Sequence, residues 1–304
     1  MSVCRFPIVT VAVLGLGVAA HAQDLEPRAY SVSPGGVNFV SLSYSRLTGD
    51  IAFDPSLPID DADAQLNRFS ASYFRSINVL GRSGNVTVVA PYVSGNLQGL
   101  LAGEFTAVRR SGMADPGLRF AVNLYGAPSM DLKEFASYRQ KTNVGASVTM
   151  VAPLGQYDPA KFVNVGSNRW SFKPEIGLSH ALRQRRLVLD AYLGVWMFSA
   201  NRDYVGQTRT QNPILNSQFH LSYNLTARAW VAFDVNFYSG GRTAVDGVPR
   251  DDLQNNSRLG GTLSVPLSRR QSMKFGYSLG AYTTVGADFH SVSVGYQYLW
   301  GGGL

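Results

Sequence analysis

The stretch that most constrains the fold is the last hairpin of the chain, Gln271–Trp300, because its second half alternates with a period of two. From Val292 to Trp300 every second side chain is apolar or aromatic, and Ser293, Gly295 and Gln297 between them are small or polar. Successive side chains of a β-strand point to opposite faces, so this pattern predicts a strand that separates two different environments. A soluble β-sheet would also produce the pattern, so other parts of the chain must distinguish a soluble sheet from a membrane barrel.

The same alternation recurs in about twelve stretches, an even number, beginning with Asn38–Ser45. The connections largely alternate between tight turns and long polar loops, which is typical of a transmembrane β-barrel. We expect the long loops at about 46–65, Ser94–Gly112, Asn201–Pro213 and Gly240–Gln254, and one short helix at Asp131–Tyr138. No run of 18 or more apolar residues is present, which argues against membrane helices. The predicted fold is therefore all-β, a transmembrane antiparallel barrel of about twelve strands.

The polar faces of these stretches predict the lining of a lumen. Only 15% of the residues are charged, and the polar faces hold mainly Ser, Gly, Asn and Gln with isolated charges. The candidate lumen-lining residues are Arg119, Lys173, Glu175, Asp190, His220, Asp234, Arg258 and Lys274. Neighbouring strands should bring Lys173 and Glu175 near Asp190, and Asp234 near Arg258. Two interpretations remain open: opposite charges that compensate one another for burial, or a polar path that selects solutes.

The N-terminus predicts export. Residues 1–22 combine Arg5, an apolar core and the cleavage pattern Ala20-His21-Ala22, as in a secretory signal peptide. The single cysteine, Cys4, lies within this segment, so the mature chain has no thiol. We expect a flexible N-terminal segment at 23–36 and the barrel at 37–304. The predicted location is the outer membrane, with its lipid and the barrel-assembly machinery as partners.

Other classes of function find little support in the sequence. The net charge of +7 is spread over scattered residues, and there is no nucleic-acid motif, so we expect no nucleic-acid partner. No zinc-ligand spacing, phosphate loop or nucleophile elbow is present, so no metal, no cofactor and no catalytic residue is predicted. His220 and Ser222 share a face, but that face should be the lumen rather than the lipid. We therefore expect that the protein is not an enzyme.

Several motifs, taken together in their order and spacing, resemble those of a known family. They are Asp115-Pro116-Gly117-Leu118-Arg119-Phe120, Leu132-Lys133-Glu134-Phe135, Pro153-Leu154-Gly155-Gln156-Tyr157-Asp158-Pro159, Asn168-Arg169-Trp170-Ser171-Phe172-Lys173-Pro174-Glu175, Tyr238-Ser239-Gly240-Gly241-Arg242-Thr243 and Asn256-Ser257-Arg258. From about Asn38 to Trp300 the chain resembles the outer-membrane barrel family labelled "putative meta-pathway of phenol degradation". The resemblance implies uptake of small, often aromatic, compounds. One departure is that Gly301–Leu304 follow Trp300, whereas such barrels commonly end on an aromatic residue read by the insertion machinery.

The predicted function is passive transport of small solutes, hydrophobic or aromatic ones among them, by a barrel without a cofactor. One alternative is a closed structural or adhesive outer-membrane barrel. A less favoured alternative is an outer-membrane lipid hydrolase. Conductance in planar bilayers would separate a channel from a closed barrel, and lipid hydrolysis by the purified protein would test the enzyme.

Overall fold

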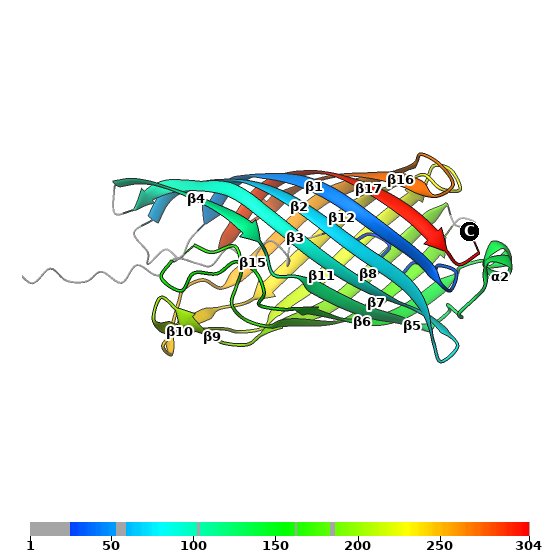
Figure 1. The fold of residues 1–304 in the computed structure, drawn as a ribbon, viewed down its shortest axis with the longest axis horizontal. Coiled ribbons are helices and arrows are strands. Elements are labelled where there is room, and N and C mark those ends of the chain that lie inside the picture. The colour runs from blue at the N-terminus through cyan, green and yellow to red at the C-terminus, as the bar shows by residue number, and fades with distance from the viewer. Residues whose placement is uncertain (1–24, 53–58, 102–103, 162, 183–185, 304) are drawn as a thin grey trace, which may run out of the picture.

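The computed structural model describes residues 25–52, 59–101, 104–161, 163–182 and 186–303. They form a closed antiparallel β-barrel of twelve strands, which confirms the predicted fold (Figure 1). The expected signal peptide lies outside the described residues. In chain order the wall consists of β1 (Val37–Ala52), β2 (Ile59–Val79), β3 (Arg82–Leu101), β5 (Gly117–Tyr125), β6 (Thr142–Val151), β7 (Ser171–Leu182), β8 (Leu187–Phe198), β11 (Ile214–Asn224), β12 (Trp230–Gly240), β15 (Gln254–Pro266), β16 (Gln271–Tyr282) and β17 (Gly286–Gly301).

The barrel closes where the last strand pairs with the first. β17 runs antiparallel to β1 over the full length of both, from Val37 opposite Gly301 to Ala52 opposite Gly286. On its other side β17 pairs with β16, and β1 pairs with β2. Closure leaves no edge of the wall unpaired at these strands, which a lipid environment requires because it offers backbone groups no hydrogen-bond partners.

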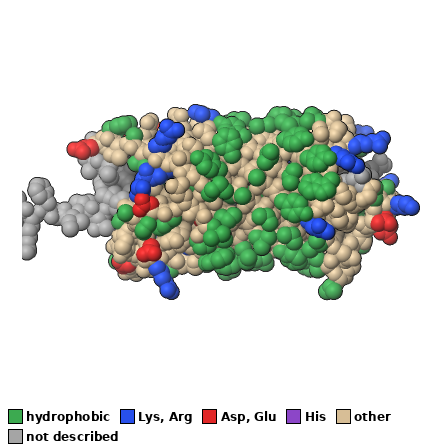
Figure 2. Space-filling view, in the orientation of Figure 1, with side chains coloured by type: hydrophobic (Ala, Val, Ile, Leu, Met, Phe, Trp, Pro, Cys, Tyr) green, Lys and Arg blue, Asp and Glu red, His purple; other side chains and the backbone are tan. Residues whose placement is uncertain are grey.

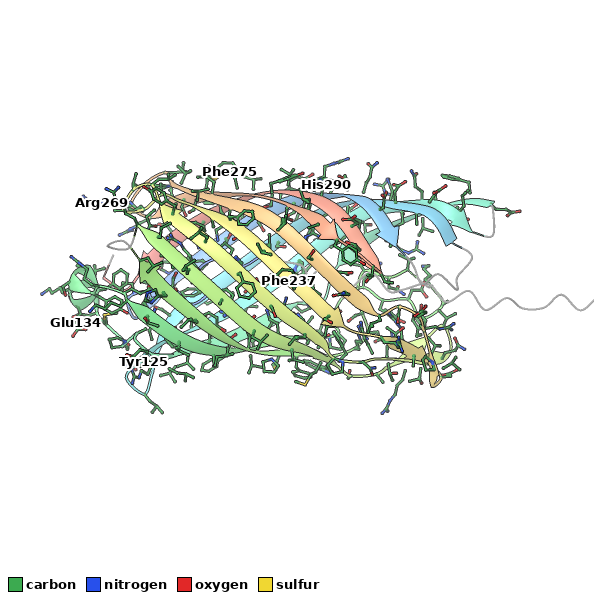
Figure 3. All side chains as sticks on the ribbon, turned by 180° about the vertical axis from the view of Figure 1, so that it is seen from behind. Tyr125, Glu134, Phe237, Arg269, Phe275 and His290 are labelled. Carbon is green, nitrogen blue, oxygen red and sulfur yellow. The ribbon has the colours of Figure 1, made fainter. Side chains whose placement is uncertain are left out.

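Outward-facing side chains form an apolar belt around the wall. From Asn216 to Ser222 the inward residues of β11 are buried and polar, whereas the outward ones include the half-exposed Phe219 and Leu221. Figure 2 shows hydrophobic side chains over the middle of the wall and charged ones towards both ends. Phe237 and Phe275 lie on this outer surface, 48% and 43% exposed (Figure 3). An apolar exterior around a polar interior is the arrangement of an outer-membrane barrel. Among the described residues, no helix is long and apolar enough to span a membrane.

Two of the loops expected from the sequence are mostly strand. β1 continues to Ala52, and β3 continues to Leu101 and pairs there with β4 (Glu104–Met113). The expectation of long loops at 46–65 and Ser94–Gly112 was therefore wrong; residues 53–58 lie outside the described part. The Asp and Gly residues in these stretches hid the strands, but cross-strand partners satisfy them, as when Gln98 donates to Asp63 (2.9 Å).

The other two long connections carry short strands of their own. β9 (Asn201–Tyr204), β10 (Gln207–Gln211), β13 (Thr243–Val245) and β14 (Val248–Pro249) form a separate four-stranded sheet at one end of the barrel (Figure 1). The opposite end holds the C-terminus and the helix α2 (Leu132–Ser137), which confirms the predicted short helix. A capping box begins α2, because Glu134 N donates to Asp131 (2.8 Å) and Asp131 N donates to Glu134 (2.9 Å). Long loops of such barrels face outward, so we refer to the end with β9 and β10 as the extracellular end.

Candidate functional site

The N-terminal stretch 25–36, here called the luminal segment, lies inside the barrel. Glu26 N donates to the side-chain oxygen of Gln218 (3.3 Å), and Ala29 N donates to the Tyr192 hydroxyl (3.1 Å). The Arg28 guanidinium donates to Asn224 (2.7 Å) and stacks on the Trp230 ring at 4.5 Å. The sequence predicts a flexible segment here, and these contacts describe where the segment lies against the wall. The stretch has no periodicity, so nothing in its sequence pointed to them.

Tyr30 anchors the luminal segment. It is 1% exposed, and its hydroxyl lies 3.0 Å from both Ser147 Oγ and Glu175 Oε1. Its ring meets Tyr192 edge-to-face with centroids 5.2 Å apart. Gly145 and Gly177 make room for this ring: a Cβ on Gly177 would lie 2.2 Å from a Tyr30 ring carbon, and one on Gly145 would lie 2.3 Å away. The two glycines of the wall therefore leave the space that the Tyr30 ring fills.

A methyl group at Gly177 should loosen this anchor. Because the added Cβ overlaps the Tyr30 ring, Gly177→Ala should lower the free energy of unfolding by about 1–3 kcal/mol. Gly295→Ala is the matched control, since its Cβ would meet nothing closer than 3.5 Å. Urea unfolding of the barrel in lipid vesicles measures both. Equal stability of the two variants would contradict the described position of Tyr30.

Glu175 joins two cations on the inner wall. Its carboxylate lies 2.9 Å from Lys173 Nζ and 3.8 Å from an Arg119 guanidinium nitrogen. Lys173 and Glu175 are 3% and 5% exposed, so the pair is buried. Arg119 also lies over the Tyr30 ring at 5.0 Å. The structure thus brings together Arg119, Lys173 and Glu175 with the luminal segment. Asp190 is not among them, because it lies opposite Ser179 on β7, four residues from Glu175.

A second buried polar group lies around His220. Its Nδ1 is 2.7 Å from Asp234 Oδ1, and Thr262 Oγ1 donates to Asp234 Oδ2 (2.8 Å). Asp190 is opposite His220 across the β8–β11 pairing. The expected neighbours Asp234 and Arg258 differ in register by two residues, since Asp234 is opposite Gly260 and Arg258 is opposite Asn236. Arg258 instead donates to the carbonyl of Phe289 and to Ser278 Oγ.

The lumen is filled on one side and hollow on the other. Large side chains on β8, β11 and β12, such as Tyr192, Gln218 and Asn236, are at most 2% exposed and fill their half. Against β1, β2, β15, β16 and β17 lies a cavity of about 390 Å³. Its lining is mainly small, with Ser41, Ser43, Gly276, Ser278, Ser291 and Ser293. Lys274 is exposed to this cavity, and Leu25 and Glu26 of the luminal segment border it.

Two further histidines, His180 and His290, lie on β7 and β17. His180 contacts Thr142 (2.8 Å) and His290 contacts Tyr277 (2.8 Å), and neither has a serine as its hydrogen-bond partner. Ser222 shares the inner face with His220 and is fully buried. Within the described ranges, no three His, Cys, Asp or Glu side chains are grouped so that they could hold a metal ion.

Comparisons with solved structures agree with the fold. The COG4313 outer membrane channel from Pseudomonas putida F1 is similar with a TM-score of 0.76 at 18% identity, covering 91% of this chain and 100% of that one. The transport unit of the autotransporter AIDA-I from Escherichia coli has a TM-score of 0.53 at 11% identity, covering 93% and 94%. Among curated proteins, none matches the sequence.

Residues 54–298 match the model of one protein family, whose description is "Putative MetA-pathway of phenol degradation". The match includes most of the wall strands, together with α2 and the separate sheet at the extracellular end. It also agrees with the resemblance carried by the motifs between Asp115 and Arg258. The chain is an outer-membrane β-barrel, and it belongs to this family.

Proposed function

We propose that this barrel lets small hydrophobic or aromatic solutes cross the outer membrane passively. The observation that carries the proposal is the cavity of about 390 Å³ inside the wall. A cavity of about 150 Å³ is enough to bind benzene in an engineered protein, so this one has room for a monoaromatic compound. Its lining combines hydroxyl groups with Phe39, Leu47 and Phe289, which suits a solute with an apolar ring and a polar substituent.

The luminal segment acts as the constriction in this proposal. Tyr30 and Tyr192 occupy the side of the lumen opposite the cavity, so a solute passes between the segment and the serine-rich wall. Transport through such a passage needs no cofactor and no covalent step. We therefore propose a channel rather than an enzyme. The solved structure with the higher TM-score is itself described as an outer membrane channel.

Shortening the anchor should widen the passage. Tyr30→Ala removes a ring that fills the lumen together with its hydrogen bonds to Ser147 and Glu175, and we expect a conductance several-fold above that of the unaltered protein. Single-channel recording in planar bilayers measures this. Tyr125→Ala is the matched control, because Tyr125 is 63% exposed and should leave conductance unchanged.

The competing function, a closed structural or adhesive barrel, makes the opposite prediction. It requires that neither the unaltered protein nor Tyr30→Ala conducts ions across a planar bilayer. That result, with a correctly folded barrel in both samples, would overturn the proposed channel.

A further inference from the structure

Two buried arginines lie at the extracellular end. Arg169 lies two residues before β7 and is 3% exposed, and Arg209 lies on β10 and is 7% exposed. Neither forms a salt bridge with a described residue. Buried charges are normally paired, because removing a charge from water is costly. A pair of buried guanidiniums without a carboxylate is therefore unusual.

The two carboxylates whose charges act on these arginines, Asp115 and Asp252, already accept hydrogen bonds from other groups. Asp115 accepts from Gly155 N (2.8 Å), Ser167 N (2.8 Å) and Ser167 Oγ (2.6 Å). Asp252 accepts from the backbone and hydroxyl of Thr243, at 2.7 and 2.6 Å. Both are 2% exposed or less. They hold the connecting chain in place and form no salt bridge with either arginine.

One nitrogen of the Arg169 guanidinium lacks a hydrogen-bond partner. Its Nη2 donates to the side-chain oxygen of Gln211, whereas its Nη1 is buried and has no hydrogen-bond partner. Both guanidiniums also lie over aromatic rings: Arg169 is 4.4 Å from the centre of Phe198, and Arg209 is 5.4 Å from the centre of Tyr204. A planar guanidinium is suited to bidentate contact with a carboxylate and to stacking on rings.

Electrostatics favours an anion at this place. Burial first, and then the charge of Arg209, lowers the pKa of Arg169 well below its usual value. Burial also lowers the pKa of Arg209, although Tyr204 and Asp252 oppose this effect. Both shifts mean that the cationic forms are disfavoured in the empty protein. A bound anion would offset that cost directly.

We infer that Arg169 and Arg209 bind the carboxylate of a small aromatic acid at the extracellular mouth. The carboxylate contacts the free Nη1 of Arg169 and the guanidinium of Arg209, and the ring of the acid packs among Phe198 and Tyr204. This inference rests on the proposed transport function and adds to it, because it names the class of solute.

Further cations stacked on rings continue inward from this site. Lys173, two residues into β7 beyond Ser171, lies over Trp196 at 5.4 Å, and Arg119 lies over Tyr30 at 5.0 Å. Phe198 and Trp196 are on the same face of β8. Both of these cations already face Glu175 and are largely buried on the side of the lumen opposite the cavity, so the binding site for the carboxylate ends at Arg169 and Arg209.

Binding to the full-length barrel in detergent tests the inference. Calorimetric titration with benzoate should show binding, with acetate weaker and the neutral benzyl alcohol weaker still. Arg169→Gln and Arg209→Gln should each weaken benzoate binding about 10- to 100-fold, the usual effect of losing a hydrogen bond to a charged group. Arg202→Gln is the matched control, because Arg202 lies on neighbouring β9 with its side chain exposed.

Thermal unfolding of the same proteins distinguishes a binding role from a structural one. If the arginines form a binding site, both variants should unfold at or above the temperature of the unaltered barrel, and benzoate should no longer stabilise them. If either variant fails to fold, or if the double variant still binds benzoate with unchanged affinity, the inference is wrong. Equal binding of acetate and benzoate would overturn its aromatic part.

The outcomes separate this inference from the proposed function. Benzoate binding that depends on both arginines, in a barrel without conductance, would support the site and refute the channel. Conductance that responds to Tyr30→Ala, with benzoate binding absent, would support the channel and refute the site.

Discussion

A chain that lacks residues 287–304 should fail to assemble as a barrel. The deletion removes nearly all of β17, which pairs with β1 over sixteen positions and with β16 over eight. The freed edges of β1 and β16 would then face lipid, where each unpaired backbone group costs several kcal/mol. We expect no folded, heat-modifiable band on electrophoresis and complete digestion by added protease.

The matched control is a deletion of Gly302–Leu304 alone. It leaves every strand pair of β17 intact, since the pairing with β1 ends at Gly301. This shorter chain should assemble with unchanged heat resistance. If the chain that lacks residues 287–304 assembled, β16 and β1 would have to close a smaller barrel, which would contradict the described closure.

The wall could be predicted because each strand carries its own evidence. In β17 the alternation of Val292, Val294 and Tyr296 with serines and glycine identifies both faces without knowledge of any partner. The extracellular ends of β1 to β4 could not be predicted, because they extend beyond the apolar belt. There, residues such as Asp50 and Asp63 face each other on neighbouring strands, and only the long-range pairing shows that they are not in a loop.

The alternation predicts which candidate residues face the lumen, but it does not predict which of them touch one another. Parity places His220 and Asp234 on the inner face, yet their contact depends on the register of β11 against β12. A shift of two residues would have paired Asp234 differently, and a single sequence gives no measure of that shift. The role of Tyr30 depends on Gly145 and Gly177, more than a hundred residues away, and the luminal segment has no pattern of its own. Arg169 and Arg209 lie outside the alternating stretches, so parity could not select them.

Loss of the Glu175 charge should destabilise the barrel strongly. Glu175→Gln keeps an acceptor for the Tyr30 hydroxyl but leaves Lys173 without its carboxylate at 2.9 Å and Arg119 without its carboxylate at 3.8 Å. Removing one partner of a buried ion pair typically costs about 3–5 kcal/mol, because the remaining charge is buried and unpaired. Urea unfolding in vesicles should show a loss of this size. Glu104→Gln, an exposed position on β4, should change stability by less than about 0.5 kcal/mol.

The double variant Lys173→Met with Glu175→Met distinguishes the two roles that the luminal charges could have. Replacing a buried ion pair with apolar side chains of similar volume is often neutral or stabilising, so this variant should regain the part of the stability that Glu175→Gln loses at Lys173, while Arg119 still lacks its carboxylate. If the pair only compensates for burial, conductance should stay the same in the double variant. Because Lys173 is buried and does not line the cavity, we expect this outcome. A benzoate current that decreases in the double variant, while the chloride current does not, would instead show that Lys173 attracts aromatic anions into the passage.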